Sequence, residues 1–239
     1  MQNISKGSAL IIGLSLLIGL VGLGYLLKTA ALEYKQFERS VTVKGLSERE
    51  YPADIVIWPI QFAFAENDLP KLYTLVDNST TKIVKFLQDQ DIKVEEITTN
   101  SPAITDKSAQ QYGGDMNAKF RYTAVQTITV YSSDVDKVRK VMTSLSSLGK
   151  EGIVFTGDNY QAQVEYLFNQ LNEVKPSMIE EATNKAREVA VKFASDSNSR
   201  LGKIKQASQG QFSITDRDKN NPHIKLVRVV STVEYYLAD

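Results

Sequence analysis

Residues 51–65 read YPADIVIWPIQFAFA, and this stretch decides the class of fold. Large apolar residues take every second position, which is the period of a strand with one buried face. They are Val56, Trp58, Ile60, Phe62 and Phe64. Such a row can also line a ligand groove, but we favour the core face. Pro59 lacks the N–H that a strand ladder needs, so we expect an edge strand or a bulge there.

Similar patterns place strands and helices on both sides of this stretch. Further strands are predicted at residues 40–47, 94–104, 120–131, 203–214 and 224–237, with extended chain at 153–168 that breaks at 157–159. Helices are predicted from Pro70 to about residue 91, from Ser133 (with Asp136 completing a capping box) to Gly149, and from Pro176 to about Asn198. Residues 105–118 are polar, contain Gly113-Gly114 and predict a loop.

The third predicted helix carries alanine at every fourth position, at residues 182, 186, 190 and 194. Side chains this small allow a helix to approach a sheet closely. The predicted apolar stripe of the helix also includes larger residues. Its members are Ile179, Ala182, Ala186, Val189, Ala190 and Phe193.

The order of elements suggests an internal repeat. Two strand–helix–strand–strand units are visible, at about residues 51–131 and 153–237, and each closes with a polar loop and a long alternating strand. Long alternating strands with one-sided helices predict an α+β fold, in which the helices pack on antiparallel or mixed sheets.

An apolar run precedes this region. Residues 9–27 form 19 consecutive positions without a charge, enough for about 28 Å of helix and close to the thickness of a membrane core. We predict a transmembrane anchor at residues 9–27, a short cytoplasmic segment at 1–8, a stalk at 28–39 and a folded domain at 40–239. The alternative is a signal peptide cleaved near Thr29-Ala30-Ala31, although the run is long for one.

The charges beside the span leave its orientation open. Lys6 precedes it, whereas Lys28, Lys35, Arg39 and Lys44 follow it, and the positive-inside rule does not favour export of the second group. Small residues four apart can let two spans pack closely. The anchor residues singled out for this reason, or as the ends of the run, are Ala9, Gly13, Ser15, Gly19 and Leu27.

Composition excludes several classes of activity. The chain of 239 residues has 28 Lys+Arg, 28 Asp+Glu, one His and no Cys. Zero net charge argues against a general nucleic-acid binder. Without Cys there is no disulfide, thiolate metal site or thiol redox cycle, and one His rules out sites that need two. We therefore expect no cofactor, no metal and no enzymatic activity.

The remaining candidate metal-binding or catalytic residues have simpler structural interpretations. Asp216, Asp218 and Asn220 have the spacing of a calcium loop, but Asn221 stands where that loop needs Gly and Val227 where it needs Glu. We interpret them, with His223, as an exposed polar turn. Acidic residues near the first hairpin could act as an acid–base pair only in a dry cleft, so we interpret them as a charged tip. They are Glu48, Glu50 and Asp54.

Tyrosines lie on the closing strands of both predicted repeats. Tyrosine and long edge strands both suit subunit contacts, which makes these residues a possible oligomer interface. The four are Tyr122, Tyr131, Tyr235 and Tyr236.

Four segments in order resemble the SIMPL domain family. Val41-Thr42-Val43-Lys44-Gly45 with Glu48 and Pro52-Ala53-Asp54 is similar to its opening strand pair, although Ala53 separates the usual Pro-Asp. Residues 85–99 and 122–148 are similar to its central segments. The last match is a helix and turn formed by Ala182, Lys185-Ala186, Ala190 and Leu201-Gly202-Lys203-Ile204, with Arg200 where the family often has Gly.

The resemblance covers about residues 40–237 and supplies no catalytic residues. The family includes bacterial periplasmic immunogenic proteins and an oxidative-stress defence protein. The resemblance implies an envelope location and a homo-oligomer such as a ring, channel or cage. We thus expect a single-pass inner-membrane protein with its C-terminal domain in the periplasm, a scaffolding or enclosing role, and an indirect part in stress defence. The alternative is a periplasmic binding module for a small ligand or an envelope protein.

Overall fold

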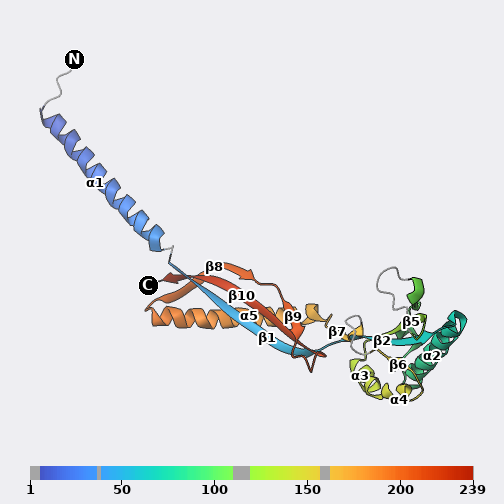
Figure 1. Ribbon diagram of the computed structural model, residues 1–239. Coiled ribbons are helices and arrows are strands. Elements are labelled where there is room, and N and C mark those ends of the chain that lie inside the picture. Colours follow the sequence, from blue (N-terminus) through green and yellow to red (C-terminus); the bar gives the residue numbers. More distant parts are fainter. Residues whose placement is uncertain (1–5, 37–38, 110–118, 157–161, 239) are drawn as a thin grey trace. The chain divides into compact units, whose positions relative to one another are not determined.

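The computed structural model describes residues 6–36, 39–109, 119–156 and 162–238. Helix α1 (Lys6–Gln36) is followed by strands and helices packed on antiparallel sheets, which confirms the predicted α+β class (Figure 1). The chain forms two compact units. Unit 1 comprises Met1–Glu48, Lys175–Ser213 and Arg228–Asp239, and unit 2 comprises Arg49–Val174 and Ile214–Val227. The predicted breaks at Gly113-Gly114 and at residues 157–159 lie outside the described residues.

Strands β2 (Ile55–Glu66) and β5 (Tyr122–Ser132) form the centre of the sheet in unit 2. They pair antiparallel from Val56 opposite Ser132 to Glu66 opposite Tyr122. Strands β3 (Ile97–Thr99) and β4 (Ala103–Asp106) pair with the other edge of β5, while β6 (Val154–Phe155) and β7 (Glu165–Leu167) pair with the other edge of β2. Every one of these pairings is antiparallel.

Helices α2 (Leu69–Asp89), α3 (Val135–Ser144) and α4 (Ser146–Gly149) supply the other layer of the core of unit 2. Asp68 and Asp134 cap α2 and α3, because their carboxylates accept from the N–H groups of Lys71 and Lys137. The cap of α3 is thus one residue later than the predicted Ser133. The predicted core face of β2 is confirmed for the four residues that are at most 5% exposed, and Phe64 is partly buried against it. The four are Val56, Trp58, Ile60 and Phe62.

Two predictions for unit 2 are wrong. Strand β2 is central, so Pro59 does not mark an edge. Its ring nitrogen falls where neither β7, which pairs residues 55–57, nor β6, which pairs residues 62–63, needs a donor. The single strand predicted at 94–104 is a 3₁₀ turn η1 (Val94–Glu96) followed by β3 and β4, because Pro102 interrupts the segment. A second 3₁₀ turn, η2 (Lys107–Ala109), follows β4.

Apart from α1, unit 1 is built from one helix on one sheet. The strands lie in the order β1 (Ser40–Pro52), β10 (Ile224–Ala238) and β8 (Arg200–Gln209), and β9 (Ser213–Asp216) also pairs with β10. Helix α5 (Leu171–Asp196) lies along this sheet in Figure 1. The unit boundaries fall inside β1, β9, β10 and α5, so the units do not follow the order of the predicted pseudo-repeats.

The contact between α5 and β1 brings backbone against backbone. A Cβ placed on Gly45 would lie 1.8 Å from the carbonyl oxygen of Ala182 and 2.4 Å from the nitrogen of Ala186. The buried side chains of α5 follow at four-residue spacing. They are Met178, Ala182, Ala186, Ala190 and Ala194. These small side chains allow the close approach of helix to sheet that the alanine spacing predicted.

Two other members of the predicted stripe are not in the core. Val189 is 51% exposed and Phe193 is 53% exposed. A helix that lies this close to a sheet buries only a narrow strip of its surface, so larger residues at its flanks stay outside.

We predict that Gly45→Ala destabilises the protein by about 3 kcal/mol or more, because the added carbon overlaps the backbone of α5 and neither can move without opening the core. Urea unfolding followed by circular dichroism measures the change. The control is Gly149→Ala, where no atom lies within 4 Å of the added carbon and stability should be nearly unchanged. Equal stability of Gly45→Ala and the wild type would contradict the contact.

Candidate functional site

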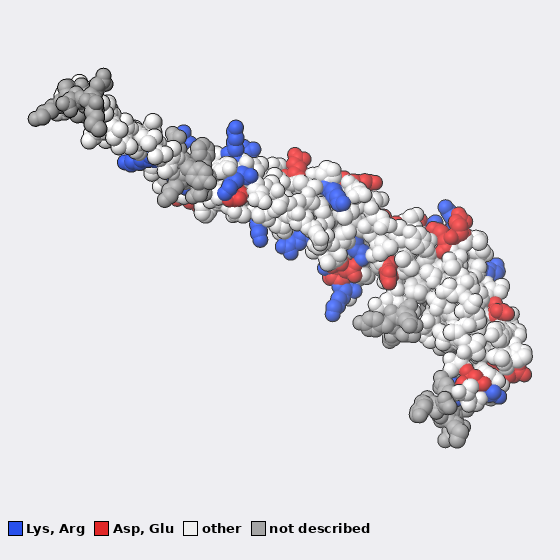
Figure 2. Space-filling model, turned by 90° about the horizontal axis from the view of Figure 1, so that it is seen from above, with Lys and Arg blue, Asp and Glu red and all other residues white. Residues whose placement is uncertain are grey.

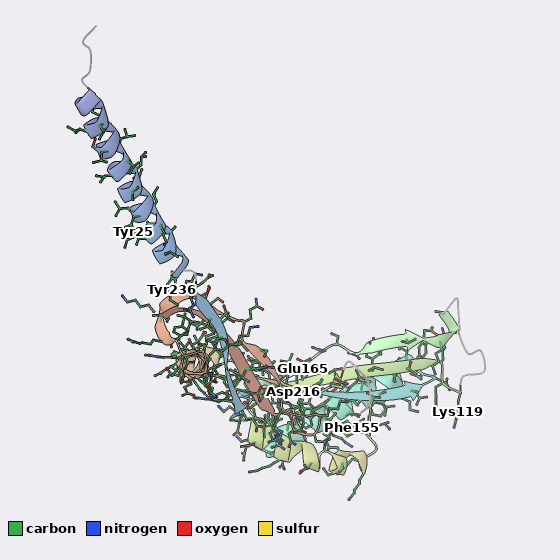
Figure 3. The ribbon with its side chains drawn as sticks, turned by 90° about the vertical axis from the view of Figure 1, so that its left-hand side faces the viewer. Tyr25, Lys119, Phe155, Glu165, Asp216 and Tyr236 are labelled. Atoms are coloured by element: carbon green, nitrogen blue, oxygen red, sulfur yellow. The ribbon has the colours of Figure 1, made fainter. Side chains whose placement is uncertain are left out.

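Helix α1 is long and apolar enough to cross a membrane over Leu10–Leu32. Its side chains project into open surroundings, and Tyr25, labelled in Figure 3, is 67% exposed. Leu27, the predicted end of the anchor, is 62% exposed. Two hydroxyl groups of the helix are satisfied within it, because Ser15 Oγ donates to the carbonyl of Ile12 at 2.9 Å and Thr29 Oγ1 to that of Tyr25 at 2.8 Å.

The predicted small-residue pairs of the anchor all lie on α1. The space beside Gly13 and Gly19 is open, since no atom lies within 4 Å of a Cβ placed on either. Ala9 is part of the helix as well. Packing of two spans through these positions stays a prediction.

Asp216, Asp218 and Asn220 form a self-contained turn. The Asp218 carboxylate accepts from the backbone N–H groups of Asn220 and Asn221 at 2.8 and 2.9 Å, and from the Asn221 amide and Arg217. These bonds, led by those from Asn221 and Arg217, lower the pKa of Asp218 to about 2. Asp216 pairs with Lys225. Among the described residues no three His, Cys, Asp or Glu side chains lie close enough to hold a metal ion.

The predicted cluster of carboxylates is divided between structural contacts. Glu48 of unit 1 faces Arg228 at 3.8 Å, and Glu50 of unit 2 faces Arg217 at 3.5 Å. Asp54 Oδ2 accepts from the N–H groups of Asn169 and Gln170 at 2.8 and 3.0 Å, just before α5 begins. Its Oδ1 is buried and accepts no hydrogen bond. Asp54 thus fixes the chain that enters α5.

His223 lies in a less exposed place than the predicted turn implies. Its carbonyl accepts from Ala53 N at 2.8 Å, and its ring meets Tyr166 edge-on with centroids 6.1 Å apart. Burial, followed by the positive charges of Arg139 and Arg217, lowers the pKa of His223. Burial also raises the pKa of Tyr166. Burial in the packing of unit 2 therefore favours the neutral form of the ring.

The four tyrosines predicted as an interface have different surroundings. Tyr131 is 50% exposed, whereas Tyr235 is 4% exposed and belongs to the core of unit 1. Tyr122 is partly buried beneath Arg121, whose guanidinium carbon lies 4.8 Å from the ring centroid. Tyr236, labelled in Figure 3, is half-buried on β10, with Lys205 Nζ 5.8 Å from its ring centroid. Their role in subunit contacts stays a prediction.

A groove runs between α5 and β8 in unit 1. Arg187 and Val191 of α5 face Lys203 and Ile204 of β8 across it, and Tyr235 lies at its base. Its volume is about 660 Å³. The sequence did not predict this groove, because helical periodicity alone does not tell how much of the sheet the helix leaves uncovered. The four-residue spacing of the alanines was the available signal, since it defines a narrow buried strip.

No patch of one charge stands out among the described residues on the face shown in Figure 2. On the face shown in Figure 2, Lys and Arg side chains occur together with Asp and Glu, and uncharged surface separates them. This mixture agrees with the equal numbers of basic and acidic residues in the chain, 28 of each.

These features define a class: an α+β protein whose N-terminal helix is apolar enough to span a membrane. The family model SIMPL, described as "Protein of unknown function (DUF541)", matches residues 41–227. The chain therefore belongs to the SIMPL family, as the resemblance predicted. A comparison with curated proteins gave no match.

We predict that His223→Gln flattens the dependence of stability on pH. Because the pKa of His223 in the folded chain is below its ordinary value of 6.5, the unfolded chain binds the proton first as the pH falls. The free energy of unfolding of the wild type thus decreases as the pH drops below about 6.5. Arg139 and Arg217 favour the neutral ring, while Asp136 and Asp218 oppose them.

Urea unfolding of both proteins between pH 8 and pH 5 measures this difference. The wild type should lose more stability than His223→Gln over that interval. Parallel curves would show that the ring titrates alike in the folded and unfolded chains.

Proposed function

We propose that this SIMPL protein is anchored in a membrane by α1 and self-associates through its folded region, with a scaffolding or enclosing role. The observation that carries the proposal is strand β8. Residues 203–209 of this strand are all exposed, although it is one edge of the sheet in unit 1. A long uncovered edge strand can pair with a strand of another chain. Proteins with such an edge strand therefore usually cover it in an assembly.

The proposed scaffolding or enclosing role depends on the shape of the assembly and not on a chemical reaction. The carboxylates and the histidine singled out in the sequence are engaged in turns, caps and packing. We propose that the protein is not an enzyme and needs no cofactor. A part in stress defence would be indirect, because a chain without Cys cannot cycle thiols.

We further propose that α1 crosses the inner membrane once and that the folded region lies in the periplasm. The resemblance to envelope proteins supports this location. The length of the folded region is compatible with it, since long domains cross membranes largely regardless of the charges beside the span.

A second candidate function is a binding module for a small ligand or an envelope protein. The groove between α5 and β8 favours it, because apolar and cationic side chains line the same depression. If the protein stays monomeric, that result favours the binding module over self-association.

We expect the full-length protein in mild detergent to form a discrete large assembly in light scattering with electron microscopy. A chain starting at Ser40, checked for folding by circular dichroism, should keep that assembly. Loss of the assembly with the anchor would move the contact to α1 and its small residues. A monomer in both cases would overturn self-association.

Because the chain has no Cys, the labelling of a single introduced Cys shows on which side of the membrane that residue lies. Ser144→Cys lies at the exposed end of α3 in unit 2 and not on β8, and Ser5→Cys precedes α1. We expect a membrane-impermeant maleimide to label Ser144→Cys in spheroplasts, and to label Ser5→Cys only after the membrane is permeabilised. The reverse pattern would place the folded region in the cytoplasm.

A further inference from the structure

Helix α5 is too narrow to cover the sheet of unit 1. A helix with its side chains is about 10–12 Å wide, and neighbouring strands are about 4.8 Å apart, so one helix covers two strands well. The core of unit 1 joins Ala186 and Ala190 of α5 to residues of β1 and β10. The latter are Val41, Val43, Val233 and Tyr235. On the third strand, β8, Leu201 also packs against this core, whereas residues 203–209 are exposed.

The uncovered strip is the groove between α5 and β8. Its walls combine apolar and basic side chains, and the apolar ones are half in solvent: Val191 is 50% exposed and Ile204 is 51% exposed. Arg187 and Lys203 supply two positive charges. In the part of the chain that the structure describes, no carboxylate forms an ion pair with either cation.

The opposite flank of α5 carries the complementary chemistry. Val189 and Phe193, one turn apart, form an exposed apolar ridge. Lys192 and Asp196 border the ridge, whereas Glu188 lies on the outer face of α5 between the two flanks, since it lines one depression with Val189 and Phe193 and another with Arg187 and Val191. Lys192 lies 3.4 Å from Asp196, and the three charges sum to one negative charge. Glu188 has no ion-pair partner among the described residues.

The ridge and the groove cannot meet within one chain. Successive residues of a helix are rotated by about 100°, so Val189 on the ridge and Val191 in the groove point about 200° apart. One copy therefore presents a groove on one flank of α5 and an apolar, acidic ridge on the other. Two surfaces of this kind fit a head-to-tail contact between copies.

We infer that the ridge of one copy (Val189 and Phe193), with the adjacent Glu188 and Asp196, binds in the groove of the next copy, beside Arg187 and Lys203. This inference rests on the proposed self-association and names its contact. Glu188 and Asp196 meet the unpaired cations, and Val189 and Phe193 cover Val191 and Ile204. A head-to-tail contact closes into a ring when its rotation allows, and otherwise runs into a filament.

Two charge-reversal variants of the full-length protein in mild detergent test the contact. The groove variant is Arg187→Glu with Lys203→Glu, and the ridge variant is Glu188→Lys with Asp196→Lys. Each variant alone places like charges across the contact. We expect the protein concentration of half-assembly, measured by light scattering, to rise about a hundredfold or more for each.

Mixing the two variants provides the decisive measurement. The acidic groove of one variant then faces the basic ridge of the other, and the remaining groove and ridge in each pair are those of the wild type. Assembly should return in the equimolar mixture. Two variants that fail to assemble even when mixed would overturn the head-to-tail contact.

The matched control is Lys82→Glu with Lys85→Glu on α2 of unit 2, which changes the net charge as much as the groove variant does. Both lysines are exposed. This control should assemble like the wild type, and circular dichroism should show that all variants fold. If the wild type assembles and neither reversal changes its size, this contact is refuted while self-association stands. A monomeric wild type refutes self-association itself.

Discussion

The backbone of β1 meets the backbone of α5 at Gly45, and the arrangement of unit 1 depends on this contact. With a Cβ on Gly45 only 1.8 Å from the carbonyl of Ala182, no other residue fits without moving the helix. The helix in turn needs small residues wherever it faces the strand, which explains the buried alanines. A helix held this close covers β1 and β10 and leaves residues 203–209 of β8 exposed. The exposed strand, the groove and the ridge all follow from this single close approach.

In unit 2, by contrast, the helices pack on the sheet through large side chains. Phe62, Ile60 and Leu72 are among its largest fully buried residues, and helices α2 and α3 stand over them. Two of its buried polar side chains are paired: Gln61 Oε1 accepts from Thr156 at 2.8 Å, and Gln126 donates to the carbonyl of Asn100 at 2.9 Å. The two units therefore differ in the size of the side chains that join their helices to their sheets.

The polar residues that suggested chemistry serve the fold. Asp54 holds the chain before α5, Asp218 closes a turn, and His223 packs against Tyr166. Their use in the fold is the physical reason why we propose self-association from a membrane anchor and not catalysis.

The sequence alone determined the long apolar helix, the α+β class, the core face of β2 and the family. Each of these depends on local periodicity or on motifs that lie close together in the chain. Only the tertiary structure showed that Pro59 lies in a central strand and that 94–104 is broken. It also showed that Val189 and Phe193 lie outside the core. The position of Pro59 depends on where two short strands end, and the exposure of Val189 depends on how close α5 comes to Gly45. Both depend on contacts between residues far apart in the chain, and the periodicity of a single segment does not predict such contacts.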